Sequence, residues 1–219
     1  MTDAHCHQSG GDDRVRELVC GERFVGIHPW DAAARAADLP RWLAEMESRL
    51  IADAALGVGE IGLDRLRDRE ISAAMREVFE RQLALAFKYR RPVVLHGAKC
   101  WGEVVRAVRA AALAAAANPP PLLFHGFSRS AGLIPDIVAL GGFISVGPAV
   151  LNLHAVNYRR LVAELPAECL LLETDRTAES AAECPPLAEI AAETARIRGR
   201  TAAEIEALTD ANALRFCPE

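Results

Sequence analysis

Short apolar runs alternate with longer helical patterns along almost the whole chain, and this alternation limits the folds that the sequence can adopt. Strands are predicted at 2–7, 23–27, 55–60, 92–96, 122–126, 142–146 and 169–174. Helices are predicted at 31–50, 69–90, 99–117, 130–140, 152–164, 186–198 and 201–216. Repeated strand–helix units build a parallel sheet, which is either a closed barrel or an open, doubly wound sheet.

The barrel is the favoured form of this parallel sheet. No G-x-G-x-x-G motif follows the first strand, so nothing favours a dinucleotide-binding open sheet. The residues suited to chemistry follow several different strands, which is typical of a (β/α)8 TIM-type barrel with its active site at the carboxyl ends of the strands. Residues 1–219 contain no linker or low-complexity segment, so we expect a single α/β domain.

Composition excludes several classes of protein. Hydrophobic residues make up 51% and charged residues 25% of the chain, which argues against disorder. A net charge of −5 argues against tight binding of duplex DNA. The chain has no apolar run of membrane-spanning length and no signal-peptide core, and its six cysteines form no C-x-x-C pair. We therefore expect a cytoplasmic protein with reduced thiols and no membrane contact; the oligomeric state leaves no signal in the sequence.

Histidines occupy strand ends in a chain that has only six of them. His5 and His7 are two apart, so on a strand both imidazoles point to the same side. His96 in PVVLHG and His125 in PLLFHGF each follow four apolar residues and precede a glycine, which leaves space beside the ring. Converging imidazoles are typical metal ligands. His154, by contrast, is expected as a solvated side chain in the middle of a helix.

Two carboxylates extend this pattern. Glu60 stands where the buried run ALGVGE ends, and Asp175 ends CLLLETD. A carboxylate at such a position needs a positive partner, and a metal pair is one. For Glu60 a helix cap or a salt bridge to the nearby arginines is an equal alternative, and for Asp64 it is the favoured one. For Asp175 a helix cap is disfavoured, because no convincing apolar helix follows.

The remaining candidates concern the substrate. His28 follows FVGI and is expected either to orient substrate or to make a structural hydrogen bond, while Trp30 is expected to plug the barrel rim. Four basic residues lie just beyond strand ends and would suit a phosphate ester, namely Arg65, Lys99, Arg129 and Arg176. The alternative is that some of them face solvent or pair with carboxylates.

Several motifs together resemble the TatD family of metal-dependent hydrolases, which have amidohydrolase-like barrels. The matching pieces are DAHCH at 3–7, GIHPW at 26–30, GEIGLD at 59–64, PVVLHG at 92–97, FHGFSRS at 124–130, GGFISVG at 141–147, LLLETD at 170–175 and DANALRF at 210–216. The resemblance implies an eight-stranded barrel with two divalent metals. It implies that His5, His7 and Asp175 hold one ion, that His96 and His125 hold the other, and that Glu60 bridges them.

The chain also departs from the family pattern in two places. Only residues 8–25 separate DAHCH from GIHPW, where the family has a full helix and second strand, so we expect a reduced barrel around strand 2 and helix 1. After LLLETD, Arg176 and Thr177 replace Ala-Pro, and the loop with Arg-Asn-Glu-Pro is missing. Both regions would border the mouth of the site, so they concern the substrate and leave the six ligand positions intact.

The resulting hypothesis is hydrolysis of a phosphate ester, such as a single-stranded nucleic-acid end, by water activated between two metal ions. Asp175 is the expected general base, with Glu60 as the second catalytic carboxylate. Zinc is expected first, with manganese, magnesium, nickel and iron as alternatives. One alternative function is hydrolysis of a C–N or lactone bond, against which the lack of a lysine suited to carbamylation argues. Another is a catalytically idle relative that acts through a protein partner.

Overall fold

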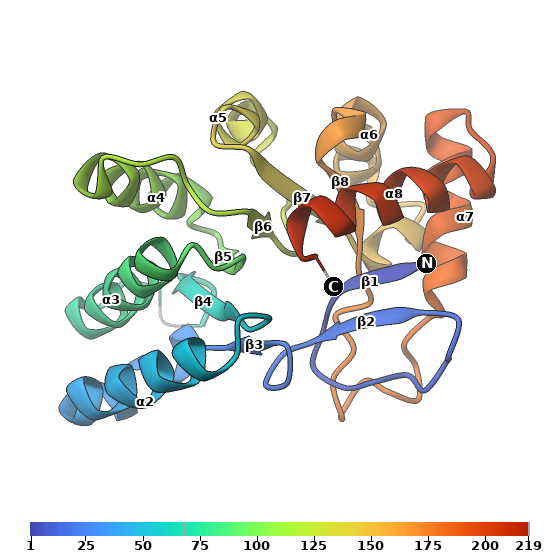
Figure 1. Cartoon of the computed structure of the whole chain (residues 1–219). Helices are drawn as coiled ribbons and strands as arrows, with labels where there is room; N and C mark the ends of the chain where they lie inside the picture. The colour runs from blue at the N-terminus through green and yellow to red at the C-terminus, as the bar shows by residue number, and fades with distance from the viewer. Residues whose placement is uncertain (68, 219) are drawn as a thin grey trace.

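The computed structural model describes residues 1–67 and 69–218, and within them eight parallel strands follow one another in sequence order (Figure 1). The strands are β1 Thr2–Cys6, β2 Arg16–Val19, β3 Phe24–Val25, β4 Gly57–Asp64, β5 Val93–Ala98, β6 Leu122–Phe124, β7 Gly142–Val146 and β8 Leu170–Leu172. The helices are α1 Ala32–Arg35, α2 Leu39–Ala52, α3 Ala73–Tyr89, α4 Trp101–Ala115, α5 Ile134–Ala139, α6 Val156–Glu164, α7 Leu187–Arg198 and α8 Ala202–Phe216. Short 3-10 turns lie at Pro29–Asp31, Ala36–Asp38, Ala131–Leu133, Pro148–Leu151 and Ala167–Cys169.

The helix boundaries follow from local chemistry. Ser72 accepts a hydrogen bond from the backbone N–H of Met75 at 3.0 Å, so α3 begins at Ala73, after the predicted start at 69. Thr201 and Glu204 form a capping box that starts α8. The helix predicted at 152–164 begins only at Val156. His154 is therefore exposed, as expected, but it lies in the turn before α6, so its predicted position inside a helix is wrong.

The barrel is reduced where the sequence predicted it. No helix separates β1 from β2, and β2 pairs directly with β1 in the register Thr2↔Arg16. The backbone ladders form a two-stranded sheet β1–β2 and a six-stranded sheet β3–β8. An isolated bridge from Cys20 to Phe24 links the two sheets between β2 and β3. The missing helix therefore leaves the strand order of the barrel unchanged.

A polar contact joins β1 to β8 at the other boundary between the sheets. The buried carboxylate of Asp3 accepts hydrogen bonds from the backbone N–H of Thr174 at 3.0 Å and from its hydroxyl at 2.6 Å. The N–H of Asp175 donates to the carbonyl of His5 at 3.1 Å. These contacts place the carboxyl ends of β1 and β8 side by side.

The other end of the barrel is closed by the last turn of α8. Phe216 is fully buried and lies 5.9 Å from Phe24 and 6.0 Å from Phe143, measured between ring centroids. The guanidinium of Arg16 donates to the carbonyl of Cys217 at 2.6 Å, and that of Arg23 donates to the carbonyl of Pro218. In Figure 1 the C-terminus accordingly lies beside β1. No helix in the described ranges is long and apolar enough to cross a membrane.

Candidate metal centre

Glu60 of β4 lies at the centre of a cluster of imidazoles. It is buried, and every histidine of the chain except His154 directs a ring nitrogen at its carboxylate. The distances to the nearer oxygen are 2.6 Å for Nδ1 of His96, 2.6 Å for Nε2 of His125, 3.2 Å for Nε2 of His7, and 3.5 Å for Nε2 of both His5 and His28. Side chains from β1, β4 and β5 and from the end of β6 therefore meet at one rim.

Asp175 completes the set of six predicted ligands. Its Oδ1 lies 3.5 Å from Nε2 of His5 and 3.7 Å from Nε2 of His7, and about half of its side chain is exposed. Donor atoms of His5, His125 and Asp175 lie within 4.8 Å of one another, as do those of His28, Glu60 and His96. The structure thus brings the six residues together, while their role as ligands stays a prediction.

The rings of His5, His96 and His125 each have one nitrogen at Glu60 and the other at a partner farther out. The outer partners are the thiol of Cys20, 3.4 Å from Nδ1 of His5, and the carboxylate of Asp64, 3.1 Å from Nε2 of His96. Within the described residues Nδ1 of His125 makes no hydrogen bond, and the carboxylate of Glu173 lies 3.7 Å from it. Metal-binding histidines are held in this way, because the outer partner fixes both the ring orientation and the tautomer.

Asp64 differs from the prediction. It is buried and forms neither a helix cap nor a salt bridge with a described arginine. Its Oδ1 accepts the backbone N–H groups of Leu66 at 2.6 Å and Arg67 at 3.0 Å, and its Oδ2 accepts the indole N–H of Trp30 at 2.7 Å. The expectation was wrong because the loop after β4 folds back over the carboxylate and occupies Oδ1, while Oδ2 contacts both Trp30 and Nε2 of His96. Trp30 lies at the rim, half exposed.

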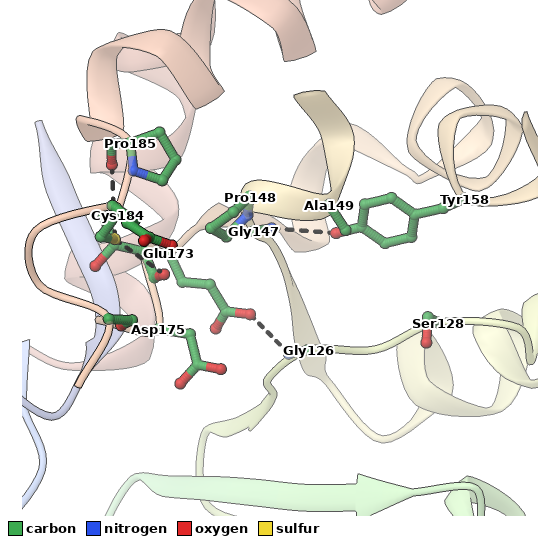
Figure 2. A pocket seen from close by; sticks show the side chains of 13 residues that line it. Gly126, Ser128, Gly147, Pro148, Ala149, Tyr158, Glu173, Asp175, Cys184 and Pro185 are labelled. Carbon is green, nitrogen blue, oxygen red and sulfur yellow. Dashed lines mark hydrogen bonds between the residues drawn. The ribbon is translucent and has the colours of Figure 1, made fainter. Parts of the chain in front are cut away.

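Glu173, which was not predicted as a site residue, is fully enclosed beside the cluster. Its Oε1 accepts the backbone N–H of Gly126 at 2.7 Å and its Oε2 accepts the hydroxyl of Ser145 at 2.6 Å; Figure 2 shows it directly above Asp175. A signal was present in the predicted strand 169–174, which contains residue 173, although β8 itself ends at Leu172. Asp3 lies two residues before His5 in β1, so the strand period places both on one side. Cys20 gave no such signal, since its position depends on the short β2.

The pKa shifts of Glu60 and His96 indicate that positive charge is favoured at the centre of the cluster. Burial alone would raise the pKa of Glu60, but the imidazoles of His125, His28 and His5 outweigh it and hold that pKa well below its usual value. Burial would lower the pKa of His96, but the carboxylates of Glu60 and Asp64 raise it instead. Nε2 of His5 and Oε2 of Glu60 are buried without a hydrogen-bond partner. A set of imidazoles and carboxylates with open, buried donor atoms fits divalent cations.

His28 is arranged differently from the other rings. Its Nδ1 accepts the backbone N–H of Trp30 at 3.2 Å and so caps the turn Pro29–Asp31. In the neutral ring Nε2 must then carry the proton, and it points at Glu60 as a donor. Both predicted roles of His28 therefore fit its geometry: the structural hydrogen bond is present, and the substrate-orienting role stays a prediction.

The four predicted basic residues have different surroundings. Arg65 forms a salt bridge with Glu103 at 2.8 Å. The guanidinium of Arg176 lies against Gly10, where a Cβ would come within 2.2 Å of its Nη1. Lys99 and Arg129 are exposed and line one cavity together with His96 and His125. Only these last two remain well placed for a phosphate, because the other two are engaged elsewhere.

Three of the six non-glycine residues with left-handed φ in the described part of the chain lie around the same rim. Lys99, Arg129 and Asp175 have left-handed φ values of 56°, 61° and 49°. Residues other than glycine rarely adopt this conformation, and such strained residues gather at functional sites, where surrounding contacts hold them. Each of the three follows a different strand, so the strain belongs to the rim as a whole.

Comparison with known proteins identifies the family of the chain. The family profile described as TatD related DNase matches residues 20–218. The chain belongs to the TatD family. The matched part contains Glu60, His96, His125 and Asp175, whereas His5 and His7 precede it.

Individual relatives include the metal-dependent hydrolase YabD of Bacillus subtilis, which is 26% identical over 88% of this chain and 75% of its own length. The 3'-5' ssDNA/RNA exonuclease TatD of Edwardsiella piscicida is 31% identical over 69% of this chain and 56% of its own length. Among solved structures, the TatD homologue YJJV of Escherichia coli is 25% identical, with a TM-score of 0.74 over 95% of this chain and 79% of that one. The protein is therefore a metal-dependent hydrolase of this family.

Proposed function

We propose that this protein hydrolyses phosphoester bonds with two divalent metal ions held by the six-residue cluster around Glu60. The observation that supports the proposal most strongly is the pairing of ring nitrogens. His5, His96 and His125 each turn one nitrogen inward to Glu60 and the other outward to Cys20, Asp64 or Glu173. A buried structural histidine needs no such common inward direction, whereas a metal ligand does.

In this proposal His5, His7 and Asp175 hold one ion, His96 and His125 hold the other, and Glu60 lies between them. When bound, two divalent ions would lower the pKa of a bound water and would stabilise negative charge on the reacting oxygens. Zinc suits a donor set of imidazoles and carboxylates, and manganese, magnesium, nickel and iron are the alternatives.

The chain itself contributes a proton acceptor and donors to a phosphate. Asp175 is the half-exposed carboxylate of the cluster, and its pKa is held below its usual value by His5 and His125 against the effect of burial, so it is ionised and able to accept a proton. The Nε2–H of His28 faces the same space. Lys99 and Arg129 add charge at the rim.

The phosphoester class is also supported by relatives that are named as ssDNA/RNA exonucleases. For C–N or lactone hydrolysis the structure offers no comparable support. Lys99, the one lysine beside the cluster, lies exposed on the cavity wall and does not contact Glu60.

Metal analysis combined with substrate assays tests the proposal. The purified protein should retain about two divalent ions per chain and release aryl alcohol from an aryl phosphodiester, or nucleotides from a short single-stranded oligonucleotide. His96→Ala with His125→Ala should abolish both metal binding and turnover. His154→Ala is the matched control for metal binding and for turnover of the aryl phosphodiester, because that exposed histidine lies outside the cluster. A metal-loaded protein that cleaves none of these substrates would refute the proposal.

A further inference from the structure

Three cavities share Ser128 in the loop after β6, and two of them adjoin the metal cluster, which also lines a cavity of its own of about 770 Å³. The inner cavity, about 760 Å³, lies between His96, Lys99 and Arg129. The outer cavity, about 850 Å³, continues from Arg129 to the first turns of α6. The acidic cavity, about 500 Å³, lies on the other side of Ser128, beside Asp175 and Glu183; Figure 2 shows Glu173, Asp175 and Ser128 among the residues that line it.

The first two cavities form one path, called the basic path, that leads away from the cluster. Its lining also contains the carboxylates of Glu103, which pairs with Arg65 at 2.8 Å, of Asp175 in the cluster, and of Glu164. Lys99 lines the inner cavity, Arg129 lines both, and Arg160 of α6 lines the outer one. All three side chains are exposed, and in residues 1–67 and 69–218 none has a carboxylate oxygen within 4.0 Å. Neighbouring arginines differ in this respect, since Arg109 pairs with Asp136 at 2.7 Å. Three exposed cations with no described carboxylate partner along one path suit an anionic ligand.

The acidic cavity has the opposite character. Its carboxylates are Glu173, Asp175 and Glu183, and no lysine or arginine lines it. The hydroxyl of Tyr158, which accepts the backbone N–H of Gly147 at 3.1 Å, belongs to its wall. A phosphate entering this side would meet like charge, whereas an uncharged sugar and base fit the volume, which is typical of small-molecule pockets.

We infer that Lys99, Arg129 and Arg160 bind successive phosphates of a single polynucleotide strand whose terminal phosphoester lies at the metal cluster. The strand leaves through the inner and outer cavities, and its terminal nucleoside occupies the acidic cavity. This inference rests on the proposed phosphoester hydrolysis and adds to it a direction and a length dependence. Phosphate contacts by lysine and arginine supply most of the sequence-independent affinity for nucleic acid, even on a chain with net negative charge.

Substrates with one phosphate and with many phosphates separate this inference from the proposed function. The assay compares an aryl ester of thymidine monophosphate with single-stranded ten-residue DNA and RNA oligonucleotides. Loss of one charge-assisted phosphate contact in Arg160→Gln should lower kcat/KM for the oligonucleotides, relative to that for the aryl ester, roughly tenfold. The dependence of log KM on log salt concentration should become shallower by about 0.7. Arg109→Gln, whose guanidinium already pairs with Asp136, is the control and should leave the ratio unchanged.

Each outcome decides one of the two statements. If the unaltered protein cleaves neither substrate class, the proposed function fails. If it cleaves both but Arg160→Gln leaves the ratio of the two rates unchanged, the basic path fails while the proposed function stands. A lowered ratio with both DNA and RNA supports recognition of phosphates alone, and a lowered ratio with only one of them restricts the path to that polymer.

Discussion

Replacing Glu60 by Gln should abolish the stabilisation of this protein by divalent metals. Glu60 contributes both carboxylate oxygens to the centre of the cluster, at 2.6 Å from His96 and His125 and 3.2 Å from His7. Only 4% of its side chain is exposed, so water has little room to replace a lost ligand. Glutamine has nearly the same shape but carries no charge and has only one oxygen, so it cannot bridge two cations.

The size of the effect follows from mass action. A metal at one hundred times its Kd stabilises the folded state by about 2.7 kcal/mol. In a domain of this size each kcal/mol shifts Tm by roughly 2–4 °C, so the unaltered protein should gain about 5–11 °C over the chelated form. Glu60→Gln should gain less than about 2 °C at the same metal concentration, because the remaining imidazoles lose their common counter-charge.

Differential scanning fluorimetry with and without chelator measures both shifts, and metal content measured on the same samples gives the stoichiometry. Glu45→Gln is the matched control, since Glu45 is exposed on α2 and is not one of the cluster residues. An equal metal-induced rise in Tm for Glu60→Gln and the unaltered protein, with equal metal content, would refute the placement of the ions around Glu60.

Two further outcomes are expected. Metal affinity should fall as pH falls, because bound protons must leave before a metal binds. Against the effect of burial, Cys20, Asp175 and Glu60 raise the pKa of His5, and Glu60 and Asp64 raise the pKa of His96. Calorimetry in buffers of different ionisation enthalpy should therefore detect proton release on metal binding, and its absence near neutral pH would contradict this account. Phe216→Ala should lower the free energy of unfolding by about 3–5 kcal/mol in urea titrations, because Phe216 fills the closed end of the barrel. The control Leu214→Ala, at a half-exposed position, should lower it by less than about 0.5 kcal/mol.

The sequence by itself determined the elements and the positions of the inward-facing groups. Strand periodicity places His5 with His7 on one side, and an apolar run followed by His-Gly marks His96 and His125 as residues at strand ends. These are local properties, because the period of two and the need to bury four apolar residues do not depend on the rest of the chain. The shortened region between β1 and β2 was also predictable, since too few residues remained for a helix.

Only the tertiary structure decided which partners those groups meet. Asp64 contacts His96, and Cys20 contacts His5. Arg65 pairs with Glu103, and Arg176 lies against Gly10. Nothing in the sequence favoured these partners over others. Such contacts depend on the register between neighbouring strands and on how each loop folds back. A shift of a few ångströms changes which oxygen or nitrogen comes within hydrogen-bonding distance, and no local pattern in the sequence encodes that distance.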